Sequence, residues 1–251
     1  MTDESESSTE RLIATVERAI AVLGALADGP HDLGTNEIAR RTGINASTVS
    51  RLLATLANDE LVGRVPASGR YRLGVGLVRL GNAALARVDL REVVRPHLIA
   101  LMEATGETAT LSIPGRDTAV TVDFVQSPST VRSVAEIGRP SVPHATATGK
   151  VYLAYAGTMP DGPLHAYTEN TIINRTRLED EVAVVRERGW ARACGEREAE
   201  LHAVAVPIRD ARGQLVAVLG IQGPAGRFGP AAMDAAVEHL RAHAATLTAV
   251  T

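Results

Sequence analysis

The sequence has little of three features: cysteine, long hydrophobic runs and net positive charge. Its 251 residues include a single cysteine, Cys194, so no disulfide can form within the chain, and we expect a cytoplasmic location. No apolar stretch approaches the roughly 20 residues that a membrane-spanning helix needs, so we expect no membrane partner. The first residues, MTDESESSTE, are acidic and polar, unlike a secretory signal, and residues 1–12 are predicted to be a disordered lead-in.

The formal net charge is −3, which argues against a uniformly basic nucleic-acid-binding surface. The charge is unevenly distributed, however. Between residues 40 and 72 there are six arginines and only two acidic residues. A small basic patch on a mildly acidic protein is typical of a site-specific DNA-binding domain.

Residues 34–56, GTNEIARRTGINASTVSRLLATL, have a helical period on both sides of a break at 42–45. Four apolar residues follow the break at helical spacing, namely Val49, Leu52, Leu53 and Leu56. Gly43 permits the positive φ that ends one helix, and Asn45 or Ser47 can cap the next. Two short helices joined by a glycine-containing turn predict a helix-turn-helix motif. The alternative is an ordinary helical hairpin whose polar face is merely solvated.

The residues that follow predict a β-hairpin, which favours the first interpretation. Residues 62–65 and 70–73 are short strand candidates around a Pro-Ala-Ser-Gly turn, and a hairpin in this place makes a winged helix. Short polar side chains on the second helix suit base edges and phosphates in the major groove, and arginines on the wing suit phosphates or the minor groove. The predicted DNA-binding residues are Arg40, Asn45, Ser47, Thr48, Ser50, Arg51, Arg64, Arg70 and Arg72.

The rest of the chain predicts a mixture of helices and strands. Helices are expected at 15–27, 76–88, 89–105, 144–155, 178–188 and 230–250. The first of them has an apolar stripe of Val16, Ala19, Ile20, Leu23 and Leu26. Strands are expected at 108–113, 118–125, 131–137, 190–193, 203–208 and 215–222. This order, with its hairpin links, predicts a mixed α/β chain whose C-terminal part is an α+β domain.

Seven stretches carry a family resemblance. They are EIARRTGINASTVSRLLATL, GRYRLGVGLVRLG, DLREVVRPHLIALMEATGET, VPHATATGK, ENTI, VAVPIRDARGQLVAVLGIQGP and the closing helix. In this order they resemble the IclR family of bacterial transcriptional regulators. The resemblance implies a winged helix-turn-helix domain over 13–74, a linker helix over 75–90 and a GAF-like effector-binding and oligomerisation domain over 91–251. It also implies a homodimer or homotetramer on a pseudo-palindromic double-stranded DNA operator.

The resemblance further implies an effector pocket in the C-terminal domain. In relatives that hold small oxo-acids, a loop matching Ala145, Thr146 and Ala147 lines the pocket, and a helix start there suits a carboxylate. This chain has Ala203, Gly220 and Gln222 where many relatives have a cysteine and two serines, and Ala193 at an acidic position. We therefore expect a bulkier, partly apolar effector, such as an aromatic acid or a branched-chain amino acid. The predicted effector-binding residues are Leu111, Phe124, Ala145, Thr146, Ala147, Cys194, Ala203, Gly220 and Gln222.

The resulting prediction is a DNA-binding transcriptional regulator, acting as a repressor, with neither a cofactor nor an enzymatic activity. A C-terminal domain that serves only oligomerisation, and a DNA-tethered enzyme, are the alternatives. Three further motifs do not support a separate function. Gly149-Lys150 lacks the other residues of a P-loop. The pair His239 and His243 lacks a third metal ligand. Finally, nothing orients Cys194 as a nucleophile beside Glu198 and His202.

Overall fold

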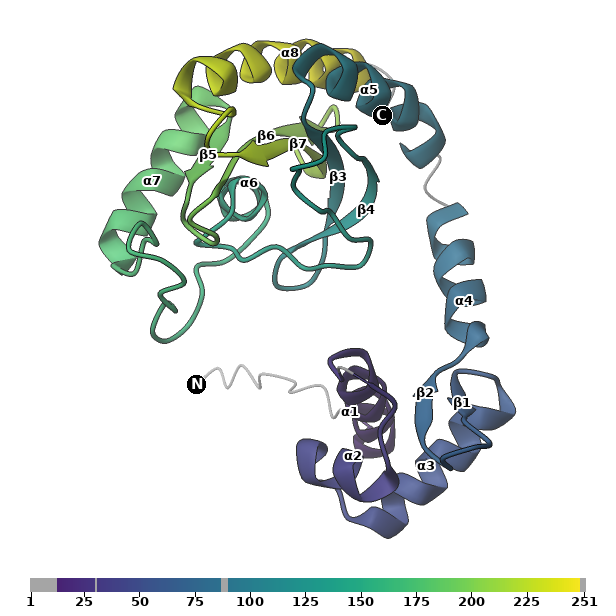
Figure 1. Ribbon diagram of the computed structural model, residues 1–251. Helices are drawn as coiled ribbons and strands as arrows, with labels where there is room; N and C mark the ends of the chain where they lie inside the picture. Colours follow the sequence, from purple (N-terminus) through teal and green to yellow (C-terminus); the bar gives the residue numbers. More distant parts are fainter. Residues whose placement is uncertain (1–12, 30, 87–89, 249–251) are drawn as a thin grey trace, which may run out of the picture. The chain divides into compact units, whose positions relative to one another are not determined.

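The computed structural model describes residues 13–29, 31–86 and 90–248, and the chain divides into two compact units between residues 87 and 88 (Figure 1). The predicted lead-in at 1–12 and the last residues of the predicted terminal helix, 249 and 250, lie outside the described residues. The two units are described separately below as the N-terminal unit and the C-terminal unit.

The N-terminal unit has the predicted winged helix-turn-helix order. Its elements are α1 (Ala14–Ala27), α2 (Thr35–Thr42), α3 (Ala46–Asn58), β1 (Val62–Arg64), β2 (Tyr71–Leu73) and α4 (Val75–Ala86). Gly43 ends α2 with a φ of 71°, and the side chain of Asn45 caps α3. β1 and β2 form an antiparallel hairpin, and Leu33 pairs with Tyr71 to extend it. The helix-turn-helix and the wing are therefore confirmed as structural elements.

The core of this unit differs from the predicted stripe on α1. Val22 and Leu26 of α1 are buried against α2, α3 and the wing, whereas Val16 and Ile20 are 52% and 63% exposed. At 3.6 residues per turn, Val16 and Ile20 lie roughly 100° and 140° around the helix from the centre of the face that Val22 and Leu26 present to the core. The stripe read from the sequence was thus wider than the surface that packs.

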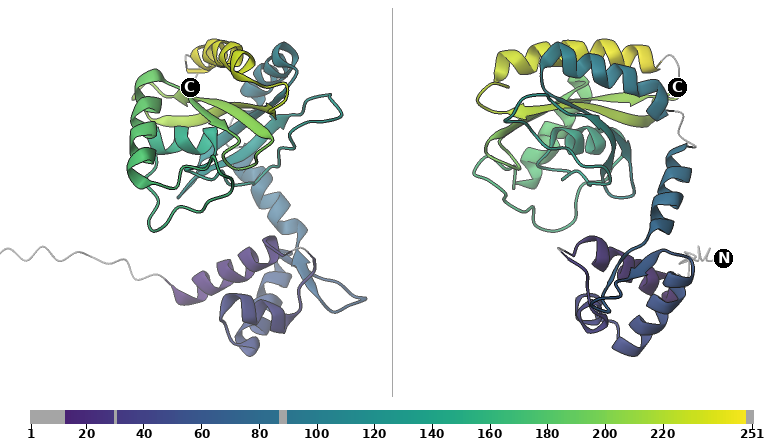
Figure 2. Two further views of the ribbon diagram at one scale, coloured as in Figure 1. Left: turned by 60° about the vertical axis from the view of Figure 1, so that its left-hand side comes forward. Right: turned by 45° about the vertical axis from the view of Figure 1, so that its right-hand side comes forward.

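The C-terminal unit is built on a five-stranded antiparallel sheet with strand order β4-β3-β7-β6-β5. Its elements are α5 (Leu90–Thr105), β3 (Thr108–Pro114), β4 (Ala119–Val125), α6 (Ala147–Tyr155), α7 (Arg175–Arg188), β5 (Ala191–Cys194), β6 (Leu201–Arg209), β7 (Leu215–Pro224) and α8 (Pro230–Thr248). Helices α5 and α8 lie side by side over one face of the sheet, and α6 packs on the other face with α7 beside it (Figures 1 and 2).

One predicted strand is wrong. Residues 131–137 form no strand, and belong to an irregular segment, 126–141, that we call the strap. Side chains take up backbone carbonyls that a strand would use, because Arg227 Nη1 donates to the carbonyl of Val131 at 2.7 Å and Thr108 Oγ1 to that of Ser133 at 2.9 Å. The free edge of β4 pairs instead with the end of the strap, where the Ser141 amide donates to the Ala119 carbonyl.

Candidate DNA-contacting surface and effector cavity

The exposed face of α3 holds three of the nine residues predicted to contact DNA. Ser47, Ser50 and Arg51 are exposed, while the four apolar residues of the helix are buried on its opposite face. Asn45 is occupied locally, since its Oδ1 accepts from the Thr48 amide at 2.8 Å and from the Ser47 hydroxyl at 2.9 Å. Capping therefore orients the first turn of α3, whose remaining polar side chains face solvent.

The wing arginines are not equivalent. Arg70 donates to the Asp32 carbonyl at 2.7 Å and lies 3.6 Å from the Glu37 carboxylate. Arg72 pairs with the Asp32 carboxylate at 3.3 Å. Arg64 is exposed and forms no ion pair with the residues that the structure describes. Two of the three predicted wing cations are thus already compensated within the unit, and Arg64 is the one left available to a phosphate.

This difference predicts distinct salt dependences. Arg64→Ala is expected to weaken binding to operator and to unrelated duplex alike, and to reduce the slope of log K against log salt by about 1, because one phosphate contact is lost. Arg72→Ala should change the slope less, since Asp32 already neutralises that side chain. Fluorescence anisotropy over a salt series measures both slopes. An equal reduction of the salt-dependence slope by the two substitutions would contradict the prediction that Arg64, and not Arg72, is available to a phosphate.

The C-terminal unit contains a cavity of about 420 Å³ on the α6 side of the sheet. Its floor includes Ala193, Ala203 and Gln222, which are cross-strand partners on β5, β6 and β7 and so present their side chains to one face. The strap and the turn between β5 and β6 form the rest of its wall. The two alanines, Ala193 and Ala203, leave part of the space that the cavity occupies.

The start of α6 faces the same cavity. Ala145, Thr146 and Ala147, three of the predicted effector-binding residues, line it together with Thr148. Thr146 caps the helix, because its hydroxyl accepts from the Gly149 amide at 3.0 Å. The amides of Ala147 and Thr148, in the first turn, have no partner within the helix, and the helix dipole favours negative charge at this end.

Four predicted effector residues do not line the cavity: Leu111, Phe124, Cys194 and Gly220. Leu111 is fully buried and alternates with Thr110, which does line the cavity, so Leu111 faces the α5–α8 layer. The thiol of Cys194 lies 4.0 Å from the sulfur of Met233 on α8. Gly220 does not enlarge the cavity, because the Thr110 hydroxyl lies 2.8 Å from where a Cβ would be.

The charged residues of the cavity wall were missed. Glu196, Arg197 and Glu198 come from the β5–β6 turn, and Arg139 comes from the strap. Arg139 and Glu198 form an ion pair of 3.5 Å that joins the strap to the turn. Burial and the neighbouring Arg139 lower the pKa of Arg197. A turn and an irregular segment have no periodicity, so only the density of charge at 196–200 marked this stretch in the sequence.

Comparison with known proteins places these features in a family. Residues 15–66 match the IclR helix-turn-helix domain, and residues 82–249 match the C-terminal domain of the bacterial transcriptional regulator IclR. The chain belongs to the IclR family. Its relatives include the glycerol operon regulatory protein of Streptomyces griseus, which is 33% identical over 224 residues and 88% of each chain.

Two solved structures of IclR proteins have a similar fold. The IclR transcriptional regulator of Alicyclobacillus acidocaldarius is 28% identical, with a TM-score of 0.82 over 95% of this chain and 99% of that one. An IclR homologue of Microbacterium hydrocarbonoxydans in complex with 4-hydroxybenzoate shares the fold at 23% identity, with a TM-score of 0.78 over 95% of this chain and 100% of that one. This IclR chain is accordingly a DNA-binding transcriptional regulator.

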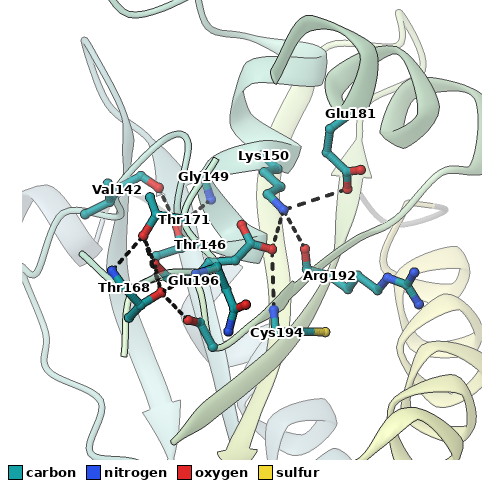
Figure 3. Close-up of polar contacts among 12 residues, drawn as sticks. Val142, Thr146, Gly149, Lys150, Thr168, Thr171, Glu181, Arg192, Cys194 and Glu196 are labelled. Carbon is teal, nitrogen blue, oxygen red and sulfur yellow. Dashed lines mark hydrogen bonds and ion pairs between the residues drawn. The ribbon is translucent and has the colours of Figure 1, made fainter. Parts of the chain in front are cut away.

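Glu196 of the cavity wall belongs to an ion cluster centred on a buried lysine in this IclR protein (Figure 3). Lys150 of α6 has a side chain that is 2% exposed, and its Nζ lies 2.7 Å from Glu196, 3.8 Å from Glu181 and 3.0 Å from the carbonyl of Arg192. Arg188 also pairs with Glu181 at 3.2 Å. The cluster joins α6, α7 and the β5–β6 turn, so Lys150 has a structural role here rather than the phosphate-binding role of a P-loop lysine.

The residues set aside as a thiol site have separate partners. Burial raises the pKa of the Cys194 thiol, which keeps the sulfur protonated at neutral pH. His202 Nδ1 is 2.9 Å from the carbonyl of Phe228, and Glu198 pairs with Arg139. Within the described ranges, no three His, Cys, Asp or Glu side chains gather as a metal site, and no helix is long and apolar enough to span a bilayer.

His243 on α8 has a partner that the sequence did not reveal. Its Nδ1 lies 2.7 Å from Nδ1 of His97 on α5. Burial, then the proximity of His97 and His239, lowers the pKa of His243, so the fold favours the neutral ring. The contribution of the neutral His243 ring to the stability of the folded state is fully present above the pKa of an unfolded histidine, about 6.5. It is lost as the pH falls towards and through the lowered pKa of His243 in the folded state.

Urea unfolding at pH 7.5, 6.5 and 5.5 is therefore expected to show a loss of stability towards acid that His243→Leu reduces. The neutral leucine has no proton to take up, so this part of the pH dependence disappears. His165→Asn, which removes an exposed histidine of the same unit, serves as the control and should leave the slope unchanged. A wild-type slope retained in His243→Leu would show that another group carries it.

Proposed function

We propose that this IclR-family regulator acts as a repressor that binds a pseudo-palindromic operator as a dimer or tetramer, and that an organic acid with an apolar body is its effector. The observation that carries the effector class is the cavity, in which a helix start lies beside a floor of alanine side chains. DNA contacts are assigned to the exposed face of α3, with Arg40 of α2 and Arg64 of the wing in support.

Both ends of the proposed ligand have counterparts in the cavity wall. A carboxylate suits the amides of Ala147 and Thr148 and the guanidinium groups of Arg139 and Arg197. Alanines in place of polar side chains suit a ring or a branched chain, and a cavity of about 420 Å³ has room for either. The homologue crystallised with 4-hydroxybenzoate supports a cavity of this fold that accepts an aromatic acid.

The first test measures binding to DNA upstream of the gene and of its neighbours, with and without benzoate, 4-hydroxybenzoate, leucine, valine, glyoxylate and pyruvate. We expect operator affinity to respond to the aromatic acids or the branched amino acids. A response to glyoxylate or pyruvate alone would refute the effector class. Binding that no compound alters favours a C-terminal unit that serves only oligomerisation. Transcription of the adjacent genes in a deletion strain tests the repressor role, which predicts an increase.

Self-association is assigned to apolar surface on the N-terminal unit. Val75, Val78 and Leu80 of α4 are exposed on this unit, and grouped apolar side chains at a surface are typical of an interface. Val78→Asp is expected to shift the oligomer towards smaller species in size-exclusion chromatography with light scattering, because a charge would be buried at the interface. Val184→Asp on α7, another exposed apolar position, is the control. An unchanged mass for Val78→Asp would remove α4 from the interface.

A further inference from the structure

Within the part of the chain that the structure describes, only one of the two carboxylate oxygens of Glu196 accepts a hydrogen bond. Its Oε1 accepts from Lys150 Nζ at 2.7 Å and from the Cys194 amide at 3.4 Å. Its Oε2 is buried and has no hydrogen-bond partner among the residues that the structure describes, and it carries no dashed line in Figure 3. Glu196 as a whole is 9% exposed. A buried acceptor without a partner is rare in folded proteins and costly, so it indicates a missing donor.

The surroundings hold this carboxylate in place. Thr171 Oγ1 donates to the carbonyl of Glu196 at 2.5 Å, and Thr168 Oγ1 donates to that of Gly195 at 2.6 Å. Lys150, itself buried, fixes the other end of the side chain. With both the backbone and Oε1 tethered, Oε2 cannot turn towards another group of the protein without breaking a bond already made.

Glu196 also belongs to the wall of the effector cavity. It lies in the β5–β6 turn, directly before Arg197, and so contributes a buried acceptor beside the donors of the same wall, the α6 amides, Arg139 and Arg197. The carboxylate of Glu198, also in the wall, is exposed and already paired with Arg139. A ligand that is only an acid matches the donors and leaves this acceptor unpaired. A ligand that also carries a donor matches both.

We propose that Glu196 recognises a hydrogen-bond donor, an ammonium or hydroxyl group, on the effector. The inference rests on the proposed function of the cavity and narrows it. The effector class becomes an organic acid that also carries such a donor: a hydroxylated aromatic acid or an amino acid, rather than an aromatic acid or branched acid that lacks one. Glu196 is then the residue that sets this specificity.

The experiment uses two pairs of probes that differ only in the donor, 4-hydroxybenzoate with benzoate and leucine with 4-methylpentanoate. Isothermal titration calorimetry on the full-length protein measures each dissociation constant. In at least one pair, we expect the donor-bearing member to bind the wild type about tenfold more tightly or better, because a hydrogen bond to a buried charge is made only by that member. The pair that shows the preference distinguishes hydroxyl from ammonium.

Glu196→Gln preserves the size of the side chain and removes its charge, so the preference should fall to about threefold or less. Glu198→Gln, in the same turn and the same wall but exposed, should keep the wild-type preference. The readout is the ratio of affinities within a pair. A merely structural role for Glu196 would weaken both members alike and leave the ratio unchanged, which would overturn the proposal.

The wild-type comparison needs no variant, so the test stands even if Glu196→Gln fails to fold. Equal affinities within both pairs would overturn the inference about Glu196 while leaving an organic acid as effector. If no member of either pair binds, the proposed effector class fails, and the inference that rests on it fails as well. These two failures are therefore distinguishable in one set of titrations.

Discussion

Lys150→Met is expected to lower the free energy of unfolding by about 3–5 kcal/mol, the usual cost of removing one partner from a buried ion pair. Methionine has a similar length but no charge. The substitution therefore leaves the buried carboxylate of Glu196 without its cation, and Glu181 with Arg188 as its remaining partner. Chemical denaturation of the wild type and the variant measures the difference.

An exposed pair of the same unit provides the control. Arg175 and Glu179 are separated by 3.3 Å on the surface of α7, and their side chains are 54% and 50% exposed. Arg175→Met should change the free energy of unfolding by less than about 1 kcal/mol, because water screens this pair. An equal loss of unfolding free energy in both variants would show that the buried Lys150 pair contributes no more to stability than the exposed pair.

Gly149→Ala is expected to weaken effector binding strongly and to cost about 1–3 kcal/mol of stability by overpacking. A Cβ at this position would lie 2.4 Å from the carbonyl oxygen of Val142 and 2.6 Å from Cα of Pro143. Both neighbours are backbone atoms, so the start of α6 must move away from the residues that directly follow the strap, Val142 and Pro143. That movement would displace Thr146 and Ala147 from the cavity wall.

The matched control is Gly213→Ala, in the turn between β6 and β7. A Cβ there meets nothing within 4 Å, although its φ of 78° makes alanine strained. This variant should lose stability without a change in effector affinity, as measured by calorimetry. Unaltered effector binding in a folded Gly149→Ala protein would contradict the assignment of the α6 start to the ligand.

The fold was predictable where the signals were local. Gly43 and Asn45 indicate the break between α2 and α3. Turn residues between runs of β-branched residues indicate the hairpins. Residues 131–137 have strand composition, yet their carbonyls bind side chains from distant parts of the chain, Thr108 and Arg227. No local pattern encodes that competition, so the strand prediction failed.

The cavity shows the same difference between features that local sequence predicts and features that depend on distant contacts. Ala203 and Gln222 both line the cavity, because they are cross-strand partners on β6 and β7 and their side chains point to the same face. Leu111 faces away from the cavity that Thr110 lines, since one step along a strand reverses the direction of a side chain. The sequence alone does not say which face of the sheet the helix α6 covers. Glu196 lies in a turn and meets Lys150 across 46 positions of sequence, a pairing that only the folded chain brings about.

The compensated arginines of the wing have a consequence for how this regulator finds its operator. Asp32 and Glu37 offset the charges of Arg70 and Arg72 before any DNA arrives, so fewer counterions are released when the wing meets an arbitrary duplex. Weaker attraction to arbitrary sequence shortens each residence at a wrong site. With the DNA contacts proposed above, discrimination then falls to the exposed face of α3, and the protein is distributed less widely over the excess of competing genomic DNA.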